Sequence, residues 1–166
     1  MRGRLWGPLA PLTLAMAALV FGFDQLHKYW MLDVYGISEK APIRITSFFD
    51  LVMVWNRGIS YGLFSTHTQE LLILVSVCIA FLLWIWACGV RNALSAAALG
   101  MVIGGALGNA LDRFARGAVA DFFHFHYQQF SWYVFNIADV AIVAGVALLM
   151  YESLFPRERG SRREKA

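Results

Sequence analysis

The segment that decides the fold is Gly104-Gly-Ala-Leu-Gly-Asn-Ala-Leu-Asp-Arg113, which closes an apolar run that begins at Ala93. Residues 93–111 carry no charge, and the run is close to the roughly 20 residues that a membrane-crossing helix requires. Closely spaced glycines on such a helix allow a neighbouring helix to approach its backbone. The segment therefore predicts a tightly packed membrane helix with an amide, a carboxylate and a guanidinium near one end.

Three further runs have similar lengths. Residues 5–23 and 71–90 carry no charge, and residues 133–151 are interrupted by Asn136 and Asp139. Only 15% of the 166 residues are charged and 59% are hydrophobic, whereas soluble domains are nearer one quarter charged. We therefore predict a single integral-membrane domain of the membrane all-α class with four transmembrane helices. These spans are expected at about residues 5–27, 69–90, 93–113 and 134–154.

Basic residues favour one side of the membrane. They precede the first span, include Arg91 in the Val90–Asn92 turn, and fill the tail at 156–166. By the positive-inside rule, the two termini and this turn are cytoplasmic. Lipid headgroups account for a basic tail beside a span, so no nucleic-acid partner is expected.

The two outer segments differ in composition. Residues 28–68 include Ile43–Trp55, which is rich in Ile, Val, Phe and Thr and favours strands. This pattern predicts a small extracytoplasmic β-sheet resting on the membrane surface. Residues 114–133 are crowded with aromatic side chains, which predicts an interfacial loop or helix.

Two aspartates near the outer ends of the spans need a partner or a chemical role, because a carboxylate at membrane depth is costly. Asp121 lies in an apolar loop, and Asp139 lies one turn after Asn136. Asn136 suits a helix cap, whereas Asp139 is expected to point into the bundle and not to cap. Two carboxylates brought together near lipid share a proton. Such a pair performs aspartic-protease chemistry. Structural hydrogen bonding and proton relay in a transporter remain open as alternatives.

A third aspartate, Asp112, suits a structural role. It stands beside Arg113 at the end of its span and is expected to form an interfacial charge couple with it. Arg116 is a second partner within reach, at i+4 on the same helix.

The motifs resemble those of the bacterial lipoprotein signal peptidases (signal peptidase II), which are four-span aspartyl endopeptidases of the inner membrane. The matching segments run in the family's order and cover nearly the whole chain. They are Asp24-Gln-Leu-His-Lys28, Asn56-Arg-Gly-Ile-Ser-Tyr-Gly-Leu-Phe64, the Gly104–Arg113 segment, Gly117-Ala-Val-Ala-Asp-Phe122 and Phe135-Asn-Ile-Ala-Asp139.

The resemblance implies a role for each matching polar residue. Asp121 and Asp139 would be the catalytic pair. The residues that would bind the substrate or orient this pair are Asn56, Gly58, Asn109, Arg113 and Asn136. The residues that would support the site are Asp24, Lys28 and Asp112.

The resemblance also implies a substrate and a location. Similar enzymes cut diacylglyceryl-modified prolipoproteins just before the lipidated cysteine, need neither a metal nor another cofactor, and are sensitive to globomycin. We accordingly expect a monomer in the inner membrane, surrounded by lipid, with its site near the outer face. The outer sheet and the interfacial segment would hold the substrate helix and its lipid.

Two departures from the family pattern leave the proposed pair untouched. His27 stands where Thr or Ser is usual, and either pairs with Asp24 or faces headgroups; Tyr61 stands where Phe is common. His124 and His126 have the spacing of a zinc site on a strand but lack further ligands nearby, so both are expected to face the interface.

Two other classes of function are weighed against the peptidase. A small proton-coupled transporter or channel subunit would also need intramembrane acids, but inverted repeats and broken helices typical of transporters are not evident. A noncatalytic membrane adaptor would use the glycine-rich face and leave Asp121, Asp139 and Arg113 without a purpose.

Overall fold

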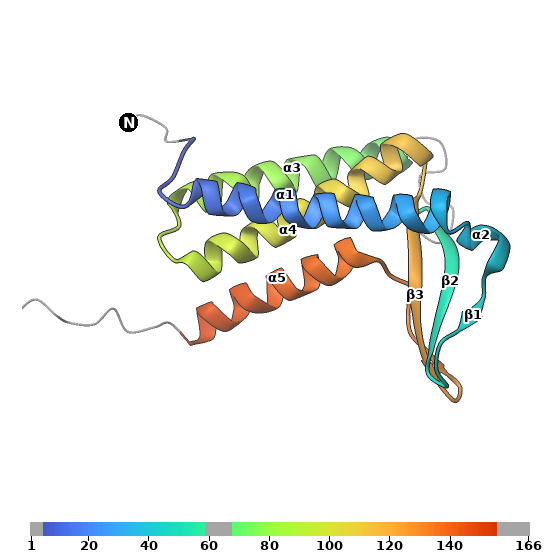
Figure 1. Ribbon diagram of the computed structural model, residues 1–166. Coiled ribbons are helices and arrows are strands. Elements are labelled where there is room, and N and C mark those ends of the chain that lie inside the picture. The colour runs from blue at the N-terminus through green and yellow to red at the C-terminus, as the bar shows by residue number, and fades with distance from the viewer. Residues whose placement is uncertain (1–4, 59–67, 156–166) are drawn as a thin grey trace, which may run out of the picture.

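The computed structural model describes residues 5–58 and 68–155, which form a bundle of long helices with a small sheet standing across one end (Figure 1). The long helices are α1 (Ala10–Tyr29), α3 (Thr68–Gly89), α4 (Ala93–Arg116) and α5 (Ile137–Leu154). A π-helical segment, η1 (Trp30–Val34), and a short helix, α2 (Ile37–Lys40), lead from α1 to the sheet.

Helix α4 lies at the centre of the bundle and packs against α1, α3 and α5. Two adjacent glycines allow this packing. A Cβ atom on Gly104 would lie 2.5 Å from the carbonyl oxygen of Ala17 in α1, and one on Gly105 would lie 2.6 Å from that of Ala138 in α5. The predicted close approach of neighbouring helices at the glycines is therefore confirmed.

Within residues 5–58 and 68–155, three helices are long and apolar enough to cross a membrane: α3, α4 and α5, with mean hydropathies of 2.8, 1.6 and 1.8. Helix α1 does not meet this criterion. It starts at Ala10 and not at residue 5, because Pro11 is accommodated only in the first turn, and the polar residues Asp24, Gln25 and Lys28 occupy its last two turns. Of the four predicted spans, the first therefore stays a prediction.

The ends of two helices differ from those predicted. Helix α4 continues to Arg116, beyond residue 113, and ends where Gly117 adopts a left-handed conformation with φ of 71°. Helix α5 starts at Ile137 and not at residue 134, because Asn136 caps it.

The sheet is antiparallel, with the strand order β1-β2-β3-β4. Its strands are β1 (Ile43–Arg44), β2 (Phe49–Asn56), β3 (Val119–Tyr127) and β4 (Phe130–Ser131). The strands predicted within Ile43–Trp55 are confirmed. The loop or helix predicted for residues 114–133 is wrong, because β3 pairs with β2 along most of its length.

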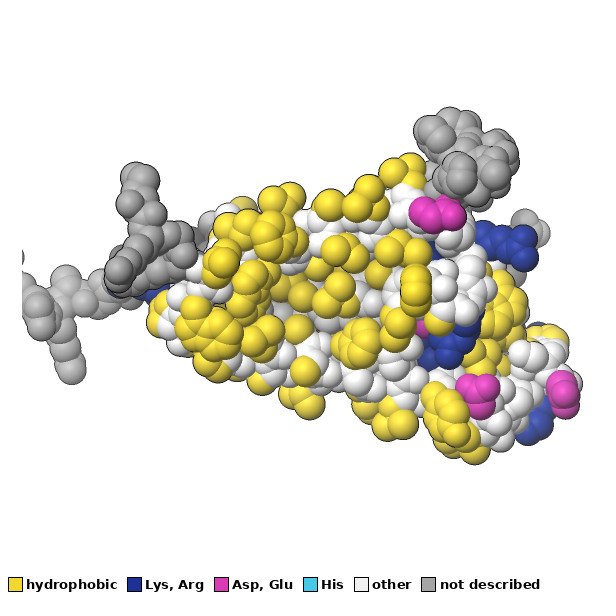
Figure 2. Space-filling view, turned by 90° about the horizontal axis from the view of Figure 1, so that it is seen from above, with side chains coloured by type: hydrophobic (Ala, Val, Ile, Leu, Met, Phe, Trp, Pro, Cys, Tyr) yellow, Lys and Arg dark blue, Asp and Glu magenta, His cyan; other side chains and the backbone are white. Residues whose placement is uncertain are grey.

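Strand β3 lacks the alternation of polar and apolar residues by which a strand is usually predicted, because its first half is buried on both faces. Val119, Ala120, Asp121 and Phe122 are all buried, so polar and apolar side chains do not alternate. Ala120 and Phe122 form a small core with Met31 of η1. This core fixes the sheet to the end of α1, and space-filling atoms show charged side chains gathered at that end (Figure 2).

Candidate active site

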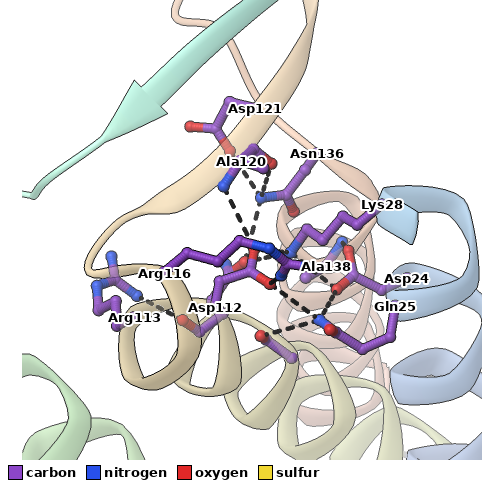
Figure 3. Close-up of polar contacts among 12 residues, drawn as sticks. Asp24, Gln25, Lys28, Asp112, Arg113, Arg116, Ala120, Asp121, Asn136 and Ala138 are labelled. Carbon is purple, nitrogen blue, oxygen red and sulfur yellow. Dashed lines mark hydrogen bonds and ion pairs between the residues drawn. The ribbon is translucent and has the colours of Figure 1, made fainter. Parts of the chain in front are cut away.

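A cluster of buried charges joins α1 to α4 below the sheet (Figure 3). The Lys28 ammonium lies 2.8 Å from a carboxylate oxygen of Asp24 and 2.8 Å from one of Asp112, and all three side chains are 0% exposed. A buried charge is tolerated only when it is paired and hydrogen-bonded. One cation between two carboxylates meets this condition.

Further donors complete this charge cluster and attach it to two other elements. The amide nitrogen of Gln25 lies 3.0 Å from Asp24 Oδ2 and 3.3 Å from Asp112 Oδ1. The backbone N–H of Ala120 in β3 donates to Asp112, and that of Ala138 in α5 donates to Asp24, at 3.3 and 3.0 Å. The cluster therefore fixes α1, α4, α5 and β3 relative to one another.

The partner expected for Asp112 is partly wrong. Asp112 pairs with Arg116 at 2.9 Å, as the i, i+4 spacing predicts, and with Lys28. The neighbouring Arg113 instead donates from Nη1 to the backbone oxygen of Asn109 at 3.3 Å. Gln25 is the side chain of the cluster that the sequence did not assign, and its polarity within an apolar helix was the available signal.

Asp121 is held by neutral amides. Asn56 Nδ2 donates to its Oδ2 at 3.0 Å, and Asn136 Nδ2 donates to its Oδ1 at 2.6 Å. The side chain of Asn56 is itself oriented by the backbone N–H of Gly58, which donates to Asn56 Oδ1 at 2.8 Å. Gly58 adopts a φ of 89°, which other residues rarely adopt. Gly58 thus acts on Asp121 through Asn56.

Asp139 lies at the start of α5 and does cap it, contrary to expectation. Its Oδ2 accepts the backbone N–H of Asn136 at 3.1 Å, while Asn136 Oδ1 accepts that of Asp139 at 3.0 Å. This reciprocal pair is a capping box. The other oxygen, Oδ1, faces α4 and accepts Asn109 Nδ2 at 2.8 Å. Asp139 therefore combines a cap with a polar contact inside the site.

Asn109 connects the charge cluster to the two aspartates. Its oxygen accepts both Lys28 Nζ and Asn136 Nδ2, at 3.1 Å each. Because an ammonium group only donates, it fixes which end of the amide is oxygen. The NH₂ group of Asn109 must then point at Asp139, and Asn136 completes the link to Asp121.

The environment of Asp121 favours its protonated form. Burial of its side chain raises the pKa from the ordinary 3.8 to about 6; the Asn56 hydrogen bond opposes this shift, and the charge of Asp139 adds to it. A carboxyl group that is neutral just below pH 6 can donate a proton to an oxygen atom.

Arg113 is a cation near the two aspartates, and it forms no ion pair within the described part of the chain. It interacts electrostatically with Asp139 and, more weakly, with Asp121. Its Nε is buried and has no hydrogen-bond partner in the described part of the chain.

The described histidines form no ion pair or hydrogen bond with the two aspartates. His27 does not form an ion pair with Asp24, and its ring lies 5.5 and 5.4 Å from those of Phe122 and Phe123. His126 Nε2 lies 3.0 Å from Asp50 Oδ2, and His124 contacts Ser131. Within residues 5–58 and 68–155, His, Cys, Asp and Glu form no group of three that could hold a metal. Tyr61 lies outside the described residues.

The fold and the site define a helical membrane protein with paired carboxylates at one end of the bundle. Two solved bacterial membrane enzyme structures, both determined by the in meso method, share this fold. One, at 2.3 Å resolution, has a TM-score of 0.73 and 23% identity, covering 93% of this chain and 94% of that one. The other, at 1.9 Å, has a TM-score of 0.74 and 25% identity, covering 87% and 93%.

Proteins found by sequence comparison are more similar to this chain than these two structures are. A model of the signal peptidase (SPase) II family matches residues 16–155. Lipoprotein signal peptidase from Methylocella silvestris is 52% identical over 84% of this chain and 84% of its own length. The enzyme of the same name from Beijerinckia indica is 48% identical over 87% and 88%. The chain belongs to the signal peptidase II family, which favours the peptidase over the transporter and adaptor alternatives.

Proposed function

We propose that this chain is a membrane aspartyl endopeptidase that removes the signal peptide from diacylglyceryl-modified prolipoproteins, cutting just before the lipidated cysteine. The observation that carries the proposal is the binding of Asp121 and Asp139 by neutral amides around a shared Asn136. No cation in the described chain forms an ion pair with either carboxylate, so both are available for proton transfer. The substrate is suggested by the name of the relatives.

The raised pKa of Asp121 supports a division of roles between the two carboxyl groups. Asp121, with its pKa raised to about 6, holds the shared proton and donates it to the oxygen of the scissile carbonyl. Asp139 takes a proton from a water molecule, whose oxygen forms the new bond to the carbonyl carbon. The tetrahedral intermediate then expels the amine, the C–N bond breaks, and the proton taken by Asp139 passes to the leaving nitrogen. Asp121 recovers its proton as the carbonyl reforms.

The remaining polar residues position these groups. Asn56, Asn109 and Asn136 orient the two carboxyl groups, and the free Nε of Arg113 binds a backbone carbonyl of the substrate. Gly58 fixes Asn56. Asp24, Lys28 and Asp112 support the site from below and do not contact the substrate.

We also propose how the chain sits in the inner membrane. Residues 1–166 form one peptidase domain in which α1 is the fourth span. Both termini are cytoplasmic, because Arg91 belongs to the turn between α3 and α4, this turn lies at the end of the bundle opposite the sheet (Figure 1), and basic residues favour the cytoplasmic side. The site then lies near the outer face, where water reaches it. The enzyme acts as a monomer without a cofactor and is sensitive to globomycin.

The test is signal-peptide release from a diacylglyceryl prolipoprotein by the full chain in lipid nanodiscs. We expect Asp121→Asn and Asp139→Asn to lose activity by about a hundredfold or more. Asp33→Asn is the matched control, since Asp33 is an exposed aspartate of η1, and it should cleave at the wild-type rate. Chelator should have no effect, and unlipidated substrate should be cut poorly. Near-normal release by either site variant would remove that residue from the catalytic pair.

A further inference from the structure

A cavity of about 720 Å³ lies at the end of the bundle opposite the sheet. It opens between the segment that precedes α1 and the turn between α3 and α4, which lie at the same end of the bundle (Figure 1). Its lining residues are Trp6, Gly7, Pro8, Leu9, Pro11 and Arg91. None of these belongs to the site described above.

The wall of this cavity is held in place by its own contacts. A Cβ atom on Gly7 would lie 2.1 Å from the backbone oxygen of Cys88, so the segment before α1 rests directly on the end of α3. The ring of Trp6 packs edge-on against Trp84 of α3 at 6.1 Å. Thr13, in the first turn of α1, donates to the backbone oxygen of Ala96 in α4 at 3.1 Å. The cavity is therefore built between three helices.

Its lining combines one charge with apolar side chains. Arg91 is exposed and forms no ion pair or hydrogen bond with any side chain in the described parts of the protein. The other lining residues are apolar or glycine, and Pro8 and Pro11 offer no backbone N–H. A complementary ligand is anionic at one point and apolar beside it.

The position of the cavity along the helices narrows the class of ligand that it fits. It lies where α3 ends at Gly89 and α4 begins at Ala93, at one end of two helices that are long and apolar enough to span a membrane. Tryptophan is enriched at this level, and basic pockets between membrane helices on the cytoplasmic side bind phosphate headgroups. Arginine matches phosphate oxygens with two parallel N–H donors.

We propose that this cavity binds the headgroup of an anionic phospholipid from the leaflet at that end of the protein. Arg91 holds the phosphate group, while Trp6, Leu9 and Pro11 contact the glycerol and the first methylene groups of the acyl chains. The inference goes beyond the peptidase reaction, because the cavity and the aspartates lie at opposite ends of the bundle.

The test measures thermal unfolding of the full chain in detergent micelles as phosphatidylglycerol or phosphatidylcholine is added, with native mass spectrometry to count bound lipids. We expect phosphatidylglycerol to raise the Tm by several degrees and phosphatidylcholine to have little effect, because ligand that binds the folded state stabilises it. Arg91→Gln should lose at least half of this rise and one bound lipid. Arg91→Lys, which keeps the charge but not the two-pronged geometry, should be intermediate.

Three controls make the result decisive. Arg44→Gln removes an exposed arginine at the sheet end and should keep the full rise. Glycerol phosphate without acyl chains should give no rise, which separates a lipid from a free phosphate. The double variant Arg2→Gln, Arg4→Gln should keep most of the rise in Tm.

The proposal is overturned if Arg91→Gln responds as the wild type does, if the two lipids act equally, or if the double variant at Arg2 and Arg4 alone abolishes the rise in Tm. Signal-peptide release by Arg91→Gln should stay normal, so the peptidase and lipid proposals are tested separately.

Discussion

Two groups of aspartates lie at the sheet end of the molecule and are held in opposite ways. Asp24 and Asp112 are buried against the Lys28 cation, at 2.8 Å each. Asp121 and Asp139 accept hydrogen bonds from side-chain amides of asparagines and from one backbone N–H. The first group is neutralised by a charge, whereas the second is oriented without one.

This difference supports the proposal that the first group has a structural role and the second a chemical one. A carboxylate next to a buried cation is held in place by it, because removing either partner leaves the other buried without a counter-charge. A carboxyl bound by neutral amides keeps both protonation states within reach, and burial raises the pKa of Asp121 to about 6. Asn109 joins the two groups. Lys28 donates to its side-chain oxygen and so fixes the orientation of the amide, and its NH₂ group donates to Asp139.

The largest expected effect comes from removing the cation of the first group. Lys28→Met leaves Asp24 and Asp112 buried without their shared partner, and we expect a loss of about 3–5 kcal/mol in the free energy of unfolding. Unfolding of the purified protein in mixed micelles with increasing denaturing detergent measures this loss. Asp121→Asn should not cause a comparable loss of stability, because it leaves no cation unpaired. Equal losses in the two variants would show that the groups do not differ.

The next largest effect is expected at Asn109, which links the two groups of aspartates. Asn109→Leu removes the donor to Asp139 and the acceptor of Lys28, so we expect kcat to fall by about 10- to 100-fold while KM changes little. Steady-state kinetics on a lipidated prolipoprotein separate the two constants. Ser95→Ala, a change at a half-buried residue near the other end of α4, is the control and should have normal kinetics. A rise in KM alone would place Asn109 in substrate binding.

The protonation of Asp121 gives a pH dependence with a defined sign. Its pKa is 3.8 when unperturbed and about 6 in the folded protein, so the folded state binds more protons between these values. The stability that this proton contributes is complete below about pH 4 and is lost as the pH rises to about 6. Unfolding measured across this window should show the decrease in the wild type and a flatter profile in Asp121→Asn. Identical profiles would contradict the raised pKa.

The smallest effect is expected at the rim of the charge cluster. Arg116 pairs with Asp112 at 2.9 Å but is 29% exposed, and Lys28 still neutralises the carboxylate in its absence. We expect Arg116→Gln to cost less than about 1 kcal/mol of stability and to leave kcat unchanged. A loss as large as that of Lys28→Met would mean that Asp112 needs both cations as partners.

Much of the site could be predicted because its residue types are unusual in apolar surroundings. Asp121, Asp139, Asn56, Asn109 and Asn136 stand out from the chain, and the structure connects all of them by hydrogen bonds. What could not be predicted were the partners. Neighbours along a helix point in different directions, so Asp112 faces Arg116 and Lys28 and does not pair with Arg113.

The errors have the same origin. Asp139 looked too deep in its helix to cap it, because the start of α5 at Ile137 depends on Asn136 and not on the apolar run. Strand β3 was missed because its burial on both faces comes from β2 and η1, which are distant in the sequence. Local periodicity carries no information about such contacts.

By itself, the sequence predicted four membrane spans, and three of them are apolar helices of membrane-spanning length in the described part of the chain. It also predicted the glycines that allow α4 to be approached closely and the carboxylates that require a partner or a function. These depend on composition and on spacing within one segment. Only the tertiary structure decided which aspartates meet a cation and which meet amides. The hydrogen bond from Asn56 to Asp121, for instance, joins residues 65 positions apart. Burial and pairing are contacts between segments, so they exist only once the segments pack.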